Sequence, residues 1–415
     1  MKELLFLSHR IPYPPNKGDK IRSFNLLKHL ARDYRVHLGT FVDDPHDWRY
    51  LPEVKALCDQ TCFVALSPGR ARARSLFGFA TGEPLSLPYY RSARLRSWVE
   101  RLLAGGTVRH VLVFSAAMAQ YVDGERPGIR RVLDFVDMDS DKWRQYAAEC
   151  RWPLSAVYRR EAWQLFGYER RAANAFETSL FVSEAEARLF VQHAPETAAR
   201  VGFIENGVDT DYFSPERDYP SPYAAEEKVL VFTGAMDYRA NVDAVTWFVK
   251  EVFPLVRAQI RAARFYIVGA RPGKEVRRLA EVPGVVVTGA VADIRPYLAH
   301  ARAAVAPLRI ARGVQNKVLE AMAMARPVIA STQAMDGIRD CPGLGPLVTD
   351  TPSAMAQQAI ALLMAEDVAG YGRRGRQCVL HHYNWTTNLS RIERMLEGDD
   401  GARPVPTRAP GRRLS

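Results

Sequence analysis

The chain has 415 residues, of which 47% are hydrophobic and 25% are charged, and its formal net charge is +11. This composition is that of a soluble globular protein, and the length predicts two domains. No run reaches the ~18 consecutive apolar residues of a transmembrane helix. The basic charge favours an acidic partner such as a nucleotide or an anionic lipid. The arginines are not accompanied by a zinc-finger spacing or an RNA-binding aromatic motif, so we expect no nucleic-acid partner.

The first half of the chain alternates short apolar strands with helices. Its start has too short an apolar run and too early an acid for a signal peptide, so we expect a buried strand at residues 3–8 and a cytoplasmic protein. Residues 11–19 form a proline-rich loop, and residues 21–31 show helical spacing of apolar side chains. Further strands are predicted at residues 35–41, 62–66, 110–114, 131–135 and 180–183.

The same alternation restarts after a stretch rich in Pro and Tyr at residues 212–223, which places a domain boundary near residue 220. Alternating strands and helices predict parallel, doubly wound sheets. The predicted fold class is α/β, with two Rossmann-like domains, residues 1–220 and 221–384, that face a cleft and bind ligand at the carboxyl ends of their strands. In the second domain a helix is predicted at residues 241–253, and strands at residues 229–233, 264–268, 285–288, 303–307 and 327–330.

The end of the chain shows two further patterns. Residues 385–397 have helical spacing, and we expect this helix to pack back toward the first domain. The tail at residues 398–415 is rich in Gly, Pro and Arg and is predicted to be disordered. No Gly-x-Gly-x-x-Gly motif follows a strand and no Walker loop is present, which argues against a dehydrogenase and against a P-loop ATPase.

Residues 313–331 carry the most informative pattern, in which a glycine precedes an apolar-striped helix, a proline and a short buried strand. Seven residues separate Gly313 from Glu320, which would place both on one helix face ~10 Å apart, with Lys317 near that face. The helix N-terminus would offer amides to a diphosphate, and the carboxylate would accept two ribose hydroxyls. This layout suits a nucleotide-sugar, although an ordinary solvated helix shows the same spacing.

Several segments together carry a resemblance to a known family. They are residues 14–24, 133–143, 204–209, 232–241, 265–270, 287–298 and 313–331. Through them the chain resembles, over nearly its whole length, the retaining glycosyltransferases of the GT-B fold, family 4 type. It is similar in particular to the sugar transferases associated with the PEP-CTERM/exosortase exopolysaccharide system. These segments are specific for the fold and the class of enzyme, and they do not specify the sugar.

The resemblance implies roles for the residues of the donor motif. Glu320 would hold the ribose hydroxyls, and a basic pair would neutralise the departing diphosphate. Lys317 and Arg239 are the candidates for that pair, although Arg239 would also suit an ordinary surface position. The backbone amides that would meet the donor phosphate or sugar belong to Gly313, Val314, Gln315 and Asn316.

One position departs from the family pattern. Family members commonly carry a glutamate eight residues before the position of Glu320, and this chain has Arg312 there. A guanidinium could recognise an acidic sugar or a phosphate oxygen of the donor, because it binds anions in a bidentate manner. A solvated arginine is the alternative.

In the first domain, the Lys17-Gly18-Asp19 loop matches the family's glycine-rich loop after the first strand, where backbone would approach the acceptor or a phosphate. A plain proline-rich turn is the alternative. His9, directly after the predicted strand, is a further titratable candidate, although a lone histidine is more often structural.

An acidic cluster follows the strand predicted at residues 131–135 and contains Asp134, Asp137, Asp139 and Asp141. We choose Asp137 as the catalytic carboxylate facing the cleft. Capping of the next helix by Asp139 or Ser140 is the alternative. The letters Asp137-Met-Asp139 match an Asp-x-Asp motif without its strand context, so we expect neither a metal nor another cofactor.

The predicted function is transfer of a sugar from a nucleoside diphosphate to a lipid-linked or polysaccharide acceptor, with retention, in exopolysaccharide biosynthesis. Two alternatives stay open, namely a nucleotide-sugar epimerase of the same fold and a catalytically silent binding subunit. Arginines interleaved with aromatic residues at 70–103 predict that the first domain lies against the anionic inner face of the membrane, with residues 91–103 as an amphipathic helix. A solvated basic face would show the same pattern.

Overall fold

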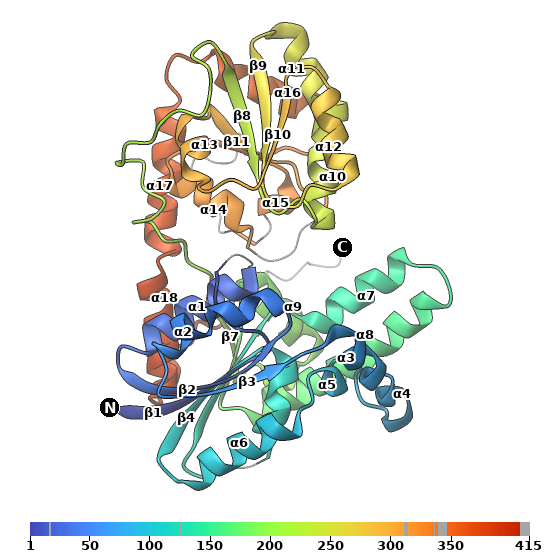
Figure 1. Cartoon of the computed structure of the whole chain (residues 1–415), viewed down its shortest axis with the longest axis vertical. Coiled ribbons are helices and arrows are strands. Elements are labelled where there is room, and N and C mark those ends of the chain that lie inside the picture. Colours follow the sequence, from blue (N-terminus) through green and yellow to red (C-terminus); the bar gives the residue numbers. More distant parts are fainter. Residues whose placement is uncertain (16–17, 125, 311–313, 336, 339–346, 407–415) are drawn as a thin grey trace, which may run out of the picture. The chain divides into compact units, whose positions relative to one another are not determined.

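The structure is a computed structural model that describes all residues except 16–17, 125, 311–313, 336, 339–346 and 407–415. The chain forms two compact units (Figure 1). Unit 1 comprises Met1–Glu205 together with Thr386–Ser415, and unit 2 comprises Asn206–Trp385. The chain therefore enters unit 2 earlier than residue 220, and the segment after Trp385 returns to unit 1.

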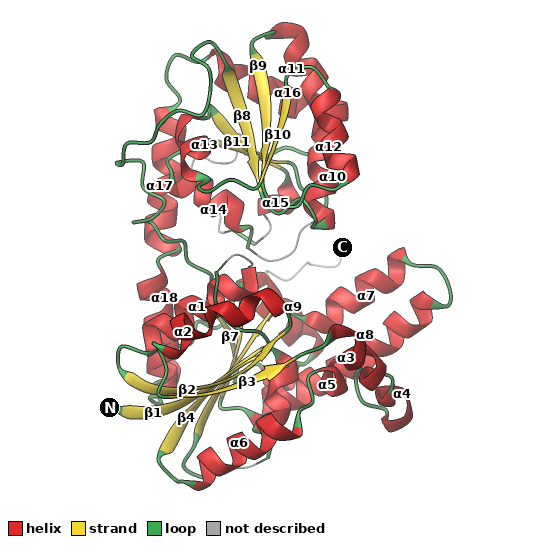
Figure 2. Cartoon of the chain, in the orientation of Figure 1, coloured by secondary structure: helices red, strands yellow, loops and turns green. Residues whose placement is uncertain are grey.

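Unit 1 is built on a seven-stranded parallel sheet with the order β3-β2-β1-β4-β5-β6-β7. Helices cover both faces of this sheet (Figure 2), which explains why its central strands are runs of apolar residues without alternation. In β1, for example, the side chains from Leu4 to Leu7 are all fully buried. The strands are β1 Lys2–Ser8, β2 Tyr34–Val42, β3 Gln60–Ala65, β4 Val108–Phe114, β5 Arg130–Val136, β6 Thr178–Phe181 and β7 Val201–Phe203.

Two helices of unit 1 form a hairpin that the sequence patterns did not predict, α7 (Asp139–Glu149) and α8 (Leu154–Ala175). The predicted amphipathic segment at residues 91–103 is α6 (Ala93–Ala104). Its apolar residues Leu95, Val99 and Leu103 are buried in the core, so this face is not available to a membrane. The other helices are α1 Gly18–Leu30, α2 Leu51–Lys55, α3 Pro68–Ser75, α4 Phe77–Thr81, α5 Ser86–Tyr89, α9 Glu184–His193 and α18 Trp385–Leu396.

Unit 2 is built on a five-stranded parallel sheet with the order β10-β9-β8-β11-β12. A π-helical turn at Phe248–Val252 joins α10 to α11, so the helix expected at residues 241–253 is longer than predicted. The strands are β8 Lys228–Thr233, β9 Ala263–Val268, β10 Val285–Gly289, β11 Ala303–Ala306 and β12 Val328–Ala330. The helices are α10 Arg239–Trp247, α11 Phe253–Gln259, α12 Lys274–Arg278, α13 Arg295–His300, α14 Asn316–Ala323, α15 Thr332–Met335, α16 Pro352–Met364 and α17 Ala369–His382.

The prediction of a disordered tail at residues 398–415 is wrong for residues 398–406. Residues 398–406 include a 3₁₀ turn at Asp400–Ala402, and the Phe203 amide on the edge strand β7 donates to the Pro404 carbonyl at 3.3 Å. An edge strand leaves amides unpaired, and this segment covers one of them. Residues 407–415 lie outside the described residues. Within the described part of the chain, no helix is long and apolar enough to cross a membrane.

Candidate active site

Two glycines bring the backbone of β8 and β9 together at the carboxyl edge of the unit 2 sheet. Gly234 follows β8 and Gly269 follows β9, and a Cβ on Gly269 would stand only 1.7 Å from the Gly234 carbonyl oxygen. A Cβ on Gly234 would stand 2.8 Å from Nδ2 of Asn241 and 3.4 Å from Cε of Lys317. Bare backbone therefore lines this edge, and Lys317 lies directly against it.

The start of α14 corrects the expected helix geometry. Gln315 has an extended backbone, with φ −87° and ψ 97°, and its carbonyl accepts the first helical bond from the Val318 amide at 2.9 Å. The helix thus begins at Asn316, and Val314 and Gln315 precede it. Glu320 lies only four residues into the helix, ~6 Å along its axis. Arg312 and Gly313 lie outside the described residues.

Lys317 and Glu320 form a half-buried pair of opposite charge on α14. Burial lowers the pKa of Lys317 to about 8, and attraction to Glu320 opposes that shift. Burial likewise raises the pKa of Glu320 to about 7, against the attraction of Lys317. The Lys317 ammonium lies 3.5 Å from Oε1 of Gln315 and 5.6 Å from the centroid of the Phe232 ring. Burial removes water from both charges, so each would be stabilised by a ligand that offers it new hydrogen bonds.

Two amide oxygens beside this pair point to a ligand. The Oδ1 atoms of Asn241 and Asn316 are buried and have no hydrogen-bond partner among the residues that the structure describes. Buried polar groups are normally paired, so each unpaired atom is a place where a ligand or water would bind. Arg239, the first residue of α10, is exposed and follows β8 at the same edge of the sheet.

A further set of residues at this edge was not predicted as part of the site. Arg295 makes a two-pronged ion pair with Asp293, at 2.7–3.0 Å, and its guanidinium lies 3.8 Å from the centroid of the Tyr212 ring. Burial, together with the carboxylates of Asp293 and Glu320, raises the pKa of Tyr212. Residues 287–298 were recognised only as a family segment, and nothing in the local sequence links them to Tyr212.

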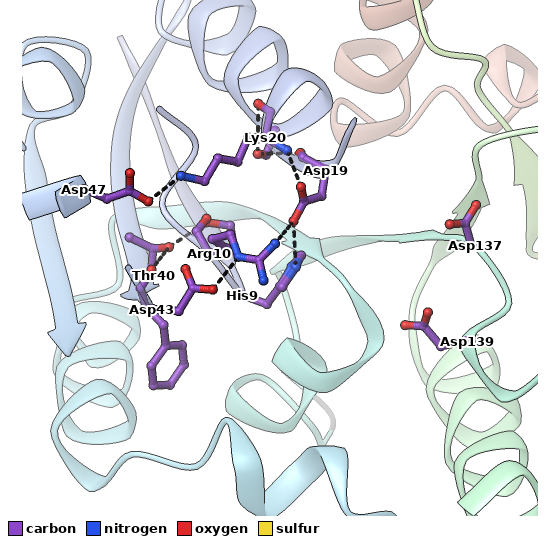
Figure 3. Close-up of polar contacts among 12 residues, drawn as sticks. His9, Arg10, Asp19, Lys20, Thr40, Asp43, Asp47, Asp137 and Asp139 are labelled. Carbon is purple, nitrogen blue, oxygen red and sulfur yellow. Dashed lines mark hydrogen bonds and ion pairs between the residues drawn. The ribbon is translucent and has the colours of Figure 1, made fainter. Parts of the chain in front are cut away.

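The carboxyl edge of the unit 1 sheet carries a second polar cluster (Figure 3). Arg10, after β1, donates to Asp19 at 2.6 Å and to Asp43, after β2, at 2.9 Å. His9 Nε2 lies 3.4 Å from the same Asp19 oxygen. Burial raises the pKa of a carboxyl, but the bonds from His9 and Arg10 hold the pKa of Asp19 well below its ordinary value. Asp19 is therefore an ionised partner of the Arg10 guanidinium and of the His9 ring.

His9 is fixed by more than this ion pair. Its ring stacks on Phe114 and meets Tyr90 edge-on, with both pairs of centroids 5.8 Å apart. Its Nδ1 atom is buried without a hydrogen-bond partner among the described residues. Of the loop predicted at Lys17-Gly18-Asp19, Gly18 and Asp19 belong to the first turn of α1, and Lys17 lies outside the described residues.

Asp137 and Asp139 lie at the same sheet edge but away from His9 and Asp19 (Figure 3). Lys142 bridges them, at 2.9 Å from Asp137 and 3.0 Å from Asp139. Although burial lowers the pKa of a lysine, the two carboxylates hold the pKa of Lys142 above its ordinary value. Val136, with φ 71°, turns the backbone just before Asp137, which is a costly conformation for a β-branched residue. Asp137, paired with Lys142, is better suited to accept hydrogen bonds from sugar hydroxyls than to remove a proton.

A buried acid on α8 makes hydrogen bonds to the segment that carries Asp137 and Asp139. Glu169 of α8 accepts hydrogen bonds from the Ser140 amide at 3.2 Å and from the Ser140 hydroxyl at 2.5 Å. Burial raises the pKa of Glu169 to about 8, more than the bonds to Ser140 lower it. Among the described residues, no group of three or more His, Cys, Asp or Glu side chains could hold a metal ion.

Comparison with known proteins agrees with this architecture. Residues 227–365 match the family described as "Glycosyl transferases group 1". A GDP-mannose-dependent alpha-(1-6)-phosphatidylinositol monomannoside mannosyltransferase from Mycobacterium tuberculosis is 29% identical over 258 residues, which is 56% of this chain and 65% of that protein. The chain thus matches less than two thirds of the length of this curated relative.

Two solved structures resemble nearly the whole chain. Sucrose-phosphate synthase from Thermosynechococcus elongatus has a TM-score of 0.68 and 18% identity, covering 96% of this chain and 98% of that one. Anabaena HepE, solved in complex with UDP and glucose, has a TM-score of 0.62 and 14% identity, covering 96% and 100%. Likeness at these identities establishes the fold. The chain therefore has the two-domain GT-B fold, and its residues 227–365 are similar to the glycosyl transferases group 1 domain.

Proposed function

We propose that the protein is a glycosyltransferase that moves a sugar from a nucleoside diphosphate to a lipid-linked or polysaccharide acceptor. The observation that carries this proposal is the position of Lys317 and Glu320 beside the bare backbone of Gly234 and Gly269, inside the matched domain. A cation, open helix amides and a carboxylate within two turns suit a diphosphate joined to a ribose.

Each part of the donor would contact a different group of unit 2. The first amides of α14 and the Lys317 ammonium meet the diphosphate, and Glu320 accepts the ribose hydroxyls. When the bond between the anomeric carbon and the phosphate oxygen breaks, negative charge grows on the leaving diphosphate. Lys317 then stabilises that charge, which is where a fixed cation contributes most to rate. Arg239 adds a second cation at the same edge.

The acceptor would bind at the carboxyl edge of unit 1. His9 offers an unpaired ring nitrogen, and Asp137 offers carboxylate oxygens to sugar hydroxyls. The Mycobacterium relative is a GDP-mannose-dependent transferase acting on a phosphatidylinositol monomannoside, which makes GDP-mannose the first donor and a glycolipid the first acceptor to test. Retention of the anomeric configuration, a role in exopolysaccharide biosynthesis linked to PEP-CTERM/exosortase systems, and action at the inner membrane face rest on the family resemblance.

The test begins with calorimetric titration of UDP, GDP, ADP and their sugars into the full chain. The donor that binds is then incubated with candidate acceptors, and the anomeric configuration of the product is read by NMR. We expect transfer by the wild type, and we expect Lys317→Ala to lower kcat strongly and to raise KM only modestly. An epimerase would alter the donor without any acceptor. Donor binding without turnover on any acceptor would instead identify a binding subunit.

A further inference from the structure

The α7–α8 hairpin exposes large aromatic and apolar side chains at its turn and on its outer surface. Trp152 in the turn is 80% exposed, and Leu154 at the start of α8 is 53% exposed. Trp163, further along α8, is 73% exposed. Side chains of this size are normally buried, so a group of them on one element indicates an interaction surface.

The segment packed against α8 exposes further apolar side chains. Phe77, the first residue of α4, is 69% exposed, and Leu76, which joins α3 to α4, is 60% exposed. Arg160 of α8 holds α4 beside it, because its guanidinium lies 4.7 Å from the centroid of the Phe79 ring and donates to the Gly78 and Glu83 carbonyls. The two elements therefore lie side by side in unit 1 (Figure 1).

Arginines give this surface a positive charge. Four exposed arginines lie on it, and none of them makes an ion pair with a described residue. Two acids of these elements have other partners, because Glu83 pairs with Arg91 at 2.9 Å and the buried Glu161 accepts from the Leu85 amide at 2.7 Å. The arginines are Arg70 and Arg72 of α3, Arg151 of the hairpin turn and Arg159 of α8.

We infer that this basic–aromatic face, formed by Leu76, Phe77, Trp152, Leu154, Trp163 and the four arginines, docks unit 1 on an anionic lipid bilayer. Exposed aromatic side chains flanked by unpaired cations match the chemistry of the lipid headgroup boundary. A protein partner would have to supply a matching set of acids. The inference deepens the proposed function, since it commits the acceptor to a lipid-linked one.

The hairpin also connects this face to the candidate acceptor residues. α7 begins at Asp139, one of the two carboxylates bridged by Lys142, and runs 11 residues to Glu149 before the exposed turn. At 1.5 Å per residue the helix spans ~16 Å. A bilayer that takes up Trp152 would thus lie about one helix length from Asp137 and Asp139. That is within reach of the polar headgroup of a lipid anchored in the same bilayer.

The experiment is cosedimentation of the full chain with vesicles of phosphatidylcholine, with and without phosphatidylglycerol. We expect binding only with phosphatidylglycerol, and weaker binding as salt shortens the screening length. The double substitution Trp152→Ser and Trp163→Ser should weaken binding by about tenfold or more, as burial of two indoles in the interface is lost. Replacing Arg72 and Arg159 by Glu should weaken it by about fivefold or more for each arginine.

Matched controls are Leu255→Ser and Arg261→Glu, two exposed residues of unit 2 that do not belong to this face, and both should bind like the wild type. Nucleotide affinity should be unchanged in all variants, which separates loss of docking from unfolding. Full-length protein that stays in the supernatant with anionic vesicles at low salt would overturn the inference. So would self-association that the same variants abolish, because it assigns the face to a second copy. Vesicle binding without sugar transfer would leave docking intact and overturn the proposed function.

Discussion

The carbonyl oxygen of Gly234 occupies the space that a side chain on Gly269 would need. A Cβ built on Gly269 lies 1.7 Å from that oxygen, and a Cβ on Gly234 would press on Asn241 and Lys317. The close approach of β8 and β9 thus fixes the backbone against which Lys317 lies. This relation makes the position of the candidate lysine depend on two residues that have no side chain.

Gly269→Ala should therefore damage both fold and site. We expect a loss of about 3 kcal/mol or more in the free energy of unfolding of unit 2, because backbone must move to admit the methyl group. Nucleotide affinity should fall with it. Denaturant unfolding and calorimetry measure the two effects. Gly273→Ala is the matched control, since nothing lies within 4 Å of its added Cβ. Equal stability of the two variants would contradict the packing argument.

Glu320→Ala should lose the carboxylate that would accept the ribose hydroxyls. One or two charge-assisted hydrogen bonds of about 1.5–3 kcal/mol each would disappear, so nucleotide affinity should fall at least about tenfold. Folding should be nearly intact, as judged by the melting temperature. Glu281→Ala removes an exposed acid from the same unit and should leave affinity unchanged. Calorimetry that finds the same affinity for Glu320→Ala would remove Glu320 from the site.

The pH dependence of nucleotide binding should follow the Lys317–Glu320 pair. The pKa of Glu320 is about 7 and that of Lys317 about 8, so both are charged together mainly between these values. Affinity should be greatest there and fall as pH rises through 8, when Lys317 loses its proton. Lys317→Arg should keep affinity at alkaline pH, because a guanidinium stays charged.

Calorimetry between about pH 6 and 9.5 checks this. A nucleoside without phosphates serves as the control ligand and should show no alkaline loss. Identical alkaline limbs for wild type and Lys317→Arg would show that another group controls the diphosphate contact.

Glu169 should make the stability of unit 1 decrease with pH. Its pKa in the folded protein is about 8 against an ordinary value of 4.5, so folding favours the protonated form. The stability that this group contributes is fully present below about pH 4.5 and is lost as pH rises through 8. Glu169→Gln removes this dependence.

We expect Glu169→Gln to gain stability relative to the wild type as pH rises from about 5 to 8, by up to about 4 kcal/mol. Thermal unfolding at several pH values measures the difference. Glu100→Gln, at an exposed position of α6, is the control and should follow the wild type. A constant difference between Glu169→Gln and wild type across this range would mean that Glu169 is ionised in the folded protein.

The sequence by itself determined the α/β class and most of the strands. Runs such as residues 3–8 and 229–233 are apolar on both faces because parallel strands are covered by helices on both sides, and this signal is local. It also placed Lys317 and Glu320 on one helix, since helical periodicity depends only on spacing. β7 was missed because its three residues include Gly202 and form no apolar run, unlike the equally short β12.

Contacts between residues far apart in the chain were decided only by the tertiary structure. The sequence suggested an apolar membrane face at residues 91–103, but packing buries Leu95, Val99 and Leu103 and leaves Trp152 and Phe77 exposed instead. An apolar helix face has the same sequence pattern whether it packs against a protein core or against lipid. Only the packing of α6 against the sheet shows that its apolar face belongs to the core. The pairing of Arg295 with Tyr212 has the same cause: spacing along the chain carries no information about which loops meet at a sheet edge.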